Sequence, residues 1–142
     1  MSVLIDSSIT IYEALQNIKD GKYVMPAFQR QYVWSMEQIE KLWDSILLDY
    51  PIATFLFWHV DDDNVTWDTY FCNFLSSVTF DSRKQADSVN YELSSIDVKL
   101  TDTAVLDGQQ RLTSLYLSLF GDAFIRQKHA RKKSGGGIVT KL

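Results

Sequence analysis

The stretch VLDGQQRL, residues 105–112, combines residue types that could bind a phosphate. An apolar strand pattern runs into a glycine turn, and an apolar helical pattern follows. Such a turn leaves backbone N–H groups at a helix N-terminus, where they and the helix dipole favour an anion. Gln109 and Gln110 add neutral donors, and Arg111 adds a planar, permanently charged group. The spacing therefore indicates a phosphate site.

Asp107 adds a carboxylate to the same turn. An acid beside a phosphate is unfavourable unless it binds a cation such as Mg²⁺, a sugar hydroxyl or an arginine. The turn therefore favours a nucleotide phosphate with a metal or ribose ligand. A purely structural interpretation is also open, because Asp-Gly turns are common. In that interpretation Asp107 is a helix N-cap, Gly108 serves the turn and Arg111 makes a surface ion pair.

A second candidate is FQRQYVW, residues 28–34, which places amides and an arginine among aromatic side chains. Arg30 could contact a phosphate, while an aromatic ring could stack on a base. Alternatively, Tyr32 and the other aromatic residues close the core over the helix that follows. Trp34 fits this alternative, since it precedes the N-cap Ser35 in the position of a hydrophobic staple.

The charge distribution argues against a protein that binds nucleic acid through overall basicity, since the net charge is −4. Near the C-terminus, however, five basic residues fall close together: Arg126, Lys128, Arg131, Lys132 and Lys133. This basic run could contact phosphates or could be a solvated loop.

The remaining features predict a cytoplasmic protein without a membrane partner. Cys72 is the only cysteine and has apolar neighbours, so it is expected to be a packed small hydrophobe in a reducing compartment. No signal-peptide pattern is present, and no apolar run approaches the roughly 20 residues that a bilayer requires. His59 is interpreted as a packing residue at the end of a strand.

Hydrophobic periodicity predicts helices over 10–20, 35–50 and from about 109 to 120, each beginning at a recognisable cap or turn. Strands are predicted at 23–25 and 104–106, and TFLFWHV, residues 54–60, is expected to form a buried strand. The Ser/Asp/Asn-rich range 76–90 predicts a surface loop, and 91–100 weakly predicts a further strand or two.

Two stretches together, PAFQRQYVWSMEQIEKLWDSILLDYPI and VLDGQQRLTSLY, resemble the N-terminal domain of GmrSD-type, modification-dependent restriction proteins. That family belongs to the ParB/sulfiredoxin-like superfamily. The resemblance implies an α/β (α+β) fold with a small mixed sheet and flanking helices. It also implies a nucleotide-binding domain at 1–125 with a variable insertion at about 61–100. The basic, glycine-rich range 126–142 is then expected to be the edge of a truncated domain.

The resemblance further implies a domain that binds a nucleoside triphosphate (NTP) and hydrolyses it with Mg²⁺ to regulate restriction of modified phage DNA. Cleavage itself would belong to an HNH-type nuclease domain or subunit, so this chain alone is not expected to be a nuclease. The residues assigned to catalysis are Asp107, Gln110 and Arg111, with Asp107 also binding the metal. Those assigned to the nucleotide are Gln29, Arg30, Gly108, Gln109 and Arg111.

Two other functions remain open at this point. The chain could be a non-catalytic DNA-binding or modification-sensing module, in which Gln31 and Tyr32 read a modified base and the basic run contacts phosphates. It could also be a protein-interaction domain that docks a nuclease partner.

Overall fold

The computed structural model describes residues 9–27, 31–59, 71–81, 83–86 and 101–126, and the backbone of 139–141. Within these ranges the helices are α1 (Ile11–Lys19), α2 (Met36–Leu47) and α4 (Gln109–Phe120). The strands are β1 (Tyr23–Pro26), β2 (Leu56–His59), β3 (Phe71–Cys72), β4 (Ser77–Phe80), β5 (Thr103–Asp107), β6 (Asp122–Arg126) and β7 (Val139–Lys141). The small mixed α+β fold is confirmed.

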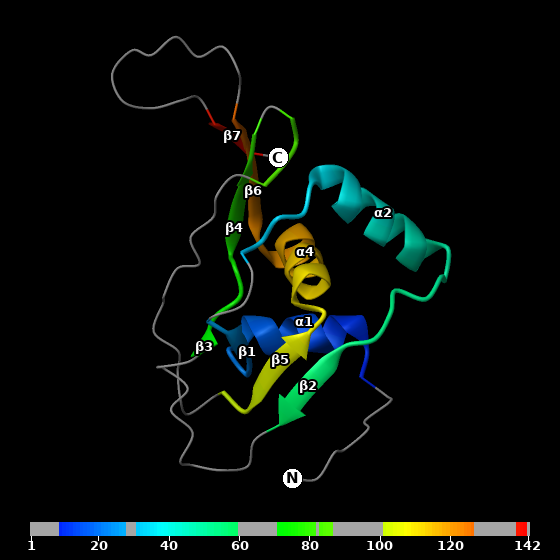
Figure 1. Ribbon diagram of the computed structural model, residues 1–142, viewed down its shortest axis with the longest axis vertical. Helices are drawn as coiled ribbons and strands as arrows, with labels where there is room; N and C mark the ends of the chain where they lie inside the picture. Colours follow the sequence, from blue (N-terminus) through cyan, green and yellow to red (C-terminus); the bar gives the residue numbers. More distant parts are fainter. Residues whose placement is uncertain are drawn as a thin grey trace.

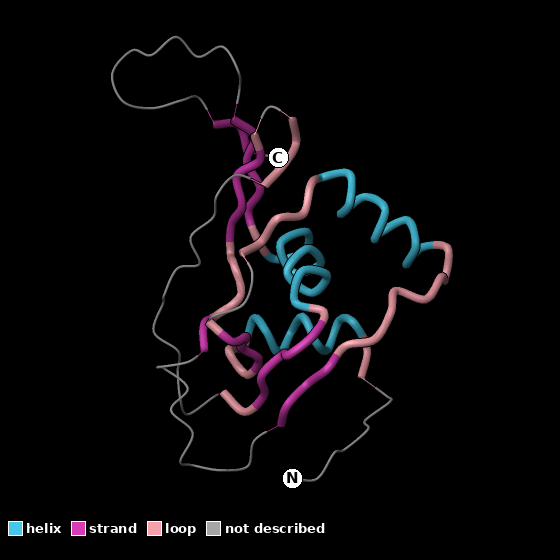
Figure 2. Tube along the Cα trace, in the orientation of Figure 1, coloured by secondary structure: helices cyan, strands magenta, loops and turns pink. Residues whose placement is uncertain are grey.

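The strands form two mixed sheets, in the orders β2-β5-β1-β3 and β4-β6-β7. In the first sheet β5 runs parallel to β1 and antiparallel to β2. In the second sheet β6 runs parallel to β4 and antiparallel to β7. Figures 1 and 2 show that α4 follows β5 directly and leads into β6, so this helix joins the two sheets.

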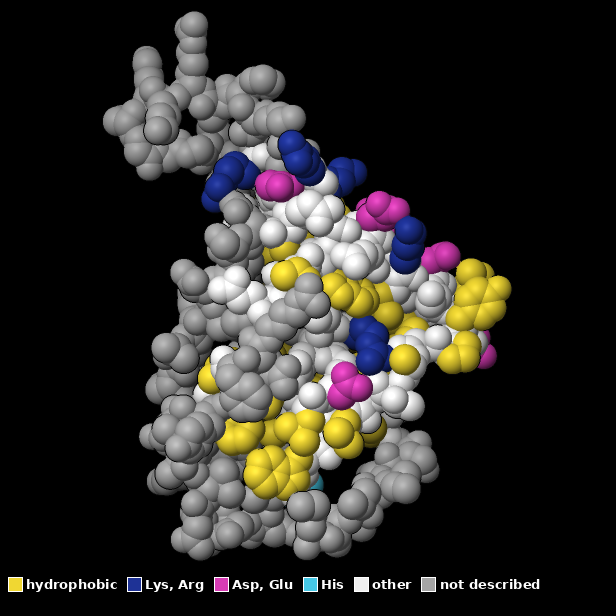
Figure 3. Space-filling model, viewed as in Figure 1, with side chains coloured by type: hydrophobic (Ala, Val, Ile, Leu, Met, Phe, Trp, Pro, Cys, Tyr) yellow, Lys and Arg dark blue, Asp and Glu magenta, His cyan; other side chains and the backbone are white. Residues whose placement is uncertain are grey.

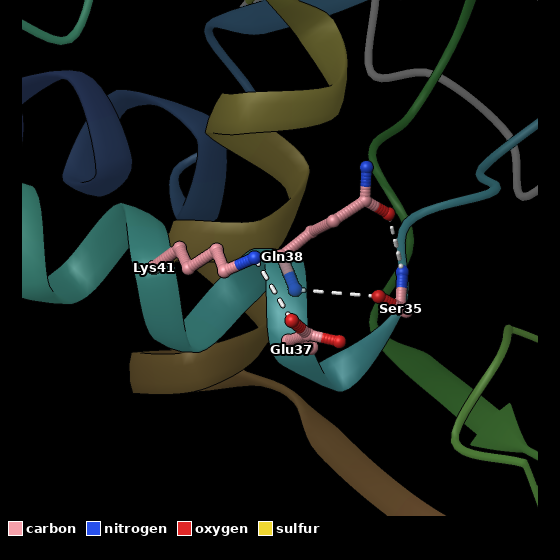
Figure 4. A network of polar contacts seen from close by, with 4 residues as sticks. All are labelled: Ser35, Glu37, Gln38 and Lys41. Atoms are coloured by element: carbon pink, nitrogen blue, oxygen red, sulfur yellow. Dashed lines mark hydrogen bonds and ion pairs between the residues drawn. The ribbon is translucent and has the colours of Figure 1, made fainter.

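Helices α1 and α2 each begin with a complete capping box, as their sequences predict. The Thr10 hydroxyl accepts the Glu13 N–H at 3.1 Å, and the Glu13 carboxylate accepts the Thr10 N–H at 2.8 Å. Ser35 and Gln38 make the same reciprocal pair at 3.3 and 2.9 Å (Figure 4). These bonds satisfy N–H groups that would otherwise have no partner within the helix.

The core has two parts, which meet at α4. One packs α1, α2 and α4 against the first sheet, around Leu15, Met25 and Leu115. The other packs Leu117 of α4 against β4 in the second sheet. Cys72 lies in the first part, and burial raises the pKa of its thiol. Its predicted role as a packed hydrophobe is confirmed.

The prediction of a buried strand at 54–60 is wrong in one respect. Strand β2 forms, but Leu56 and Trp58 are 53% and 38% exposed. The reason is position: β2 is the outer strand of its sheet and pairs with β5 alone. A β-rich run records strand propensity and does not say whether the strand lies at the centre or the edge.

The prediction of a surface loop over 76–90 is also wrong at its start. Ser77–Phe80 forms β4, in which Val78 and Phe80 are buried and alternate with more exposed neighbours. The residues of 91–100, for which the sequence predicts a further strand or two, lie outside the described residues.

The second sheet takes in part of the range 126–142. Arg126 of β6 pairs with Val139 of β7, so a connection of residues 127–138 links two neighbouring strands. The basic residues Lys128, Arg131, Lys132 and Lys133 lie outside the described residues. In Figure 3, Lys and Arg side chains gather at the end of the molecule where Figure 1 places β4 and β6.

Exposed apolar side chains gather at the end of α2, where Leu47, Leu48 and Tyr50 are 80%, 54% and 63% exposed. Hydrophobic side chains are also visible over the region of β2 and β5 (Figure 3). Among the helices of the described residues, none is both long and apolar enough to cross a bilayer.

Candidate functional site

The turn between β5 and α4 differs from the starts of the other two helices. Its N-cap is Gly108, which has a left-handed backbone with φ of 85° and provides no side-chain cap. The Asp107 carboxylate accepts the Gly108 N–H at 2.8 Å and lies before the cap. Asp107 is therefore not the helix N-cap that the structural interpretation assumed. The first turn of α4 begins without the side-chain acceptor that α1 and α2 possess.

An aromatic ring closes one side of this turn. A Cβ atom built on Gly108 would lie 2.3 Å from Cδ1 of Phe55 and 2.8 Å from its Cε1. Two features therefore require glycine at this position: the left-handed backbone, and the Phe55 ring that lies where a Cβ atom would be. The sequence indicated the first requirement, whereas the second depends on a residue far away in the chain.

Arg111 holds the segment that carries this ring. Its two terminal nitrogens donate to the carbonyl oxygens of Ile52, at 2.5 Å, and Thr54, at 3.0 Å. The guanidinium carbon also lies 4.7 Å from the centroid of the Phe55 ring, a cation–π distance. Two carbonyls and a ring thus take the place of the ion pair that the structural interpretation assumed. The charge nevertheless remains in the first turn of α4.

Gln110, the neighbour of Arg111, holds a different segment. Its side-chain oxygen accepts the Val33 N–H at 3.1 Å, and its side-chain nitrogen donates to the Gln31 carbonyl at 3.1 Å. Between these two residues, Tyr32 is buried and its hydroxyl lies 2.7 Å from the hydroxyl of Ser114. Residues 31–33 are therefore brought to α4, whereas Gln29 and Arg30, which were expected to face this turn, lie outside the described residues.

Gln109 reaches back toward the strand that precedes it. Its side-chain nitrogen donates to the carbonyl oxygens of Val105 and Leu106 at 2.9 and 3.3 Å. These bonds fix the exit of β5 relative to the start of α4. Consecutive residues of one helical turn therefore bind three separate stretches of backbone, namely 105–106, 31–33 and 52–54.

The turn retains groups suited to an anion and a cation. The side chain of Asp107 is exposed at the end of β5, next to the uncapped helix start. The described residues contain no group of three or more His, Cys, Asp or Glu side chains that could hold a metal. One carboxylate suits Mg²⁺ in particular, since this ion is commonly held by one or two carboxylates together with substrate phosphates.

Of the other predicted site residues, the structure describes Gln31, Tyr32 and Arg126. Gln29 and Arg30 lie outside the described residues. Gln31 is exposed beside Gln110, whereas Tyr32 is 2% exposed, so a base could stack on its ring only if the segment moved. Arg126 is exposed at the end of β6.

Sequence reasoning missed Ile52, Thr54, Phe55 and Ser114. Ile52 and Thr54 act through backbone carbonyls, which no residue type marks in a sequence. Ser114 could have been found, because it follows Gln110 by one helical turn and lies on the same face of α4.

Tyr32 gives this region a predicted dependence on alkaline pH. Burial raises the pKa of Tyr32 from 10.0 to about 12, and the hydrogen bond with Ser114 lowers it in part. The folded pKa exceeds the unfolded one, so this contribution to stability is fully present below about pH 10 and is lost as the pH rises to about 12. We expect the free energy of unfolding to fall by about 2 kcal/mol over that window.

Denaturant unfolding of the wild type and of Tyr32→Phe between pH 8 and pH 12 measures this loss. The phenylalanine variant cannot ionise at this position, so the difference between the two proteins isolates Tyr32 from the other titrating groups. Parallel curves for the two proteins would show that Tyr32 ionises as easily in the folded state as in the unfolded one.

Replacement of Thr113 is predicted to stabilise the protein. Its hydroxyl is buried in α4 and has no hydrogen-bond partner among the described residues, which is unfavourable. Thr113→Val should therefore stabilise the protein by about 1 kcal/mol. Thr103→Val is the control, because the buried Thr103 hydroxyl donates to Asp102 at 2.8 Å and should be costly to remove. Thermal unfolding of both variants tests the contrast; destabilisation of both would mean that Thr113 has a partner.

Comparison with known proteins places these features in a family. The chain matches the family model described as the GmrSD restriction endonuclease N-terminal domain over residues 11–139. It is also 29% identical, over 114 residues, to the uncharacterized protein MJ0686 of Methanocaldococcus jannaschii. That alignment covers 80% of this chain but 17% of the relative, so the chain spans about a sixth of the relative's length.

The matched range contains the Gly108 turn together with both segments that Gln110 and Arg111 hold. Since the family model covers most of the chain, the protein belongs to the family of GmrSD restriction endonuclease N-terminal domains.

Proposed function

We propose that this domain binds a nucleoside triphosphate at the Asp107–Arg111 turn and hydrolyses it with Mg²⁺, as a regulatory part of a DNA restriction system. The observation that carries the proposal is the uncapped start of α4. The same chain caps α1 and α2 with complete capping boxes, but it opens α4 with a left-handed glycine and no side-chain acceptor. An anion is the natural partner for such a helix end.

The side chains around the turn suit a triphosphate with its metal. Asp107 is exposed and would hold Mg²⁺ with the phosphate oxygens. Arg111 has five N–H donors, of which two bonds to carbonyls use only part, so it could also donate to a phosphate. Gln29 and Arg30 remain candidates for the same ligand through the neighbouring segment. Charge neutralisation of this kind lowers the barrier to phosphoryl transfer.

Isothermal titration calorimetry with ATP, GTP, CTP and UTP, each with and without Mg²⁺, tests the binding step. We expect micromolar to millimolar binding by the wild type and at least tenfold weaker binding by Arg111→Ala. Arg83→Ala is the control for the loss of one positive charge, because Arg83 is exposed on the loop after β4. Absence of binding by a folded wild-type protein would reduce the turn to a structural element.

The parts of a restriction system beyond this domain are proposals as well. The family name connects such domains with an endonuclease, and the described relative is far longer than this chain. We propose that an HNH-type nuclease domain or subunit acts together with this domain on modified DNA. In this arrangement nucleotide hydrolysis controls cleavage, and the chain itself cuts nothing.

DNA is the second candidate ligand. Its support is the pairing of Arg126 with Val139, which brings together the two ends of the connection whose sequence contains Lys128, Arg131, Lys132 and Lys133. Phosphate contacts by such residues would make DNA affinity fall steeply with salt. Fluorescence anisotropy with duplex DNA at several salt concentrations measures this. An affinity that does not change with salt would remove the basic run from the interface.

A further inference from the structure

The side chain of Gln110 is hydrogen-bonded to the backbone of residues 31 and 33. We propose that Gln110 is a positioning residue, which fixes the segment Gln31–Trp34 against α4, and that it does not orient the attacking water. The inference rests on the nucleotide site proposed above, because the fixed segment continues directly from Gln29 and Arg30. Three structural observations carry it.

The first observation is the two-point contact of the Gln110 side chain. Its oxygen accepts from the Val33 N–H and its nitrogen donates to the Gln31 carbonyl, both at 3.1 Å. In extended backbone, residues i and i+2 present these groups to the same side of the chain. One planar amide that bonds both of them fixes the rotation of the segment as well as its distance from α4.

The second observation concerns Tyr32, which lies between Gln31 and Val33 in the chain. The Ser114 hydroxyl donates its single proton to the Gln110 carbonyl at 2.7 Å. It must therefore accept from the Tyr32 hydroxyl, which lies 2.7 Å away. Since Tyr32 is buried and Ser114 is fully buried, this pair is shielded from competing water.

The third observation is that these hydrogen bonds form one connected network between α4 and the segment. Ser114 follows Gln110 by one turn, so both residues face the segment from the same side of α4. The Gln110 side chain holds residues 31 and 33, while its backbone carbonyl holds Ser114 and, through it, Tyr32. An amide that is engaged at both its oxygen and its nitrogen is better suited to holding backbone than to moving with a water molecule.

Hydrogen–deuterium exchange of the ligand-free protein tests the holding role. Gln110→Glu keeps the shape of the side chain but presents an oxygen to the Gln31 carbonyl instead of a donor. We expect residues 31–34 to exchange about tenfold faster in Gln110→Glu and in Ser114→Ala, which corresponds to about 1.4 kcal/mol of local stability. Peptides from β5 serve as the internal reference for global unfolding.

Ser118→Ala is the matched control. The Ser118 hydroxyl makes the same bond one turn further along α4, to the Ser114 carbonyl at 2.7 Å, but Ser118 is exposed and is not hydrogen-bonded to residues 31–34. Its exchange at residues 31–34 should equal that of the wild type. Unchanged exchange in Gln110→Glu would overturn the inference, whatever the protein does with nucleotide.

Nucleotide titration and turnover then separate positioning from catalysis. A positioning role predicts that Gln110→Glu and Ser114→Ala each weaken nucleotide affinity about tenfold, lower kcat less, and do not add in the double variant. Loss of kcat alone, at unchanged affinity and exchange, would indicate instead that Gln110 orients the attacking water. If the wild type binds no nucleotide, the proposed function fails, and faster exchange in the variants still supports the holding role.

Discussion

The Gly108→Ala protein is expected to be about 3 kcal/mol less stable than the wild type. An alanine would have to adopt the left-handed backbone of Gly108, with φ of 85°, at a cost of about 1 kcal/mol. Its methyl group would also lie 2.3 Å from the Phe55 ring, so the ring would have to leave its place over Arg111. Overpacking of this kind costs about 1–3 kcal/mol. Chemical denaturation measures the sum.

Gly21 provides the control for this substitution. Its backbone is also left-handed, with φ of 79°, but a Cβ atom there would meet nothing within 4 Å. Gly21→Ala should therefore cost about 1 kcal/mol, from the backbone alone. In a Phe55→Ala background, Gly108→Ala should cost no more than Gly21→Ala does. Equal costs for the two glycines in the wild-type background would show that Phe55 gives way freely.

If the domain hydrolyses NTP as proposed, Asp107→Asn is expected to slow that hydrolysis at least about a hundredfold, because a metal contributes several kcal/mol to charge stabilisation in such a transition state. Asparagine keeps a side-chain oxygen that can accept the Gly108 N–H, so the turn should be preserved. What changes is the charge. Phosphate release assays, run at several Mg²⁺ concentrations, should show that the variant no longer responds to the metal.

Binding without Mg²⁺ is the control for the aspartate variant. Removal of a negative charge beside the phosphates should leave metal-free nucleotide affinity unchanged or improve it. Circular dichroism checks that the variant is folded. Hydrolysis by Asp107→Asn at the wild-type rate would contradict the proposed role of Asp107 in binding the metal.

The parts of the fold that depend on local sequence were predictable. Capping boxes at Thr10 and Ser35 act within four residues, so the starts of α1 and α2 follow from the sequence. The strand, glycine turn and helix around Gly108 are equally local. The pairing of β4 with β6 joins residues more than 40 positions apart, and neither strand has a strong apolar pattern, so neither was foreseen.

The candidate site was predictable in its residues but not in their partners. The polar residue types at 107–111 indicated a turn that could bind a phosphate. The groups that Gln110 and Arg111 bind, however, are backbone atoms of residues 31, 33, 52 and 54, and every residue offers the same backbone atoms. Only the three-dimensional packing decides which of them come within reach.

The two holding residues have a joint effect on α2. Gln110 holds the chain just before this helix and the adjacent Arg111 holds it just after, while α2 itself buries only Leu42. Figure 1 shows α2 at the margin of the molecule, beside α4. Residues 31–54 thus form a segment whose two ends are bound by adjacent residues of α4. This segment should open as one cooperative unit, at a lower free energy than global unfolding.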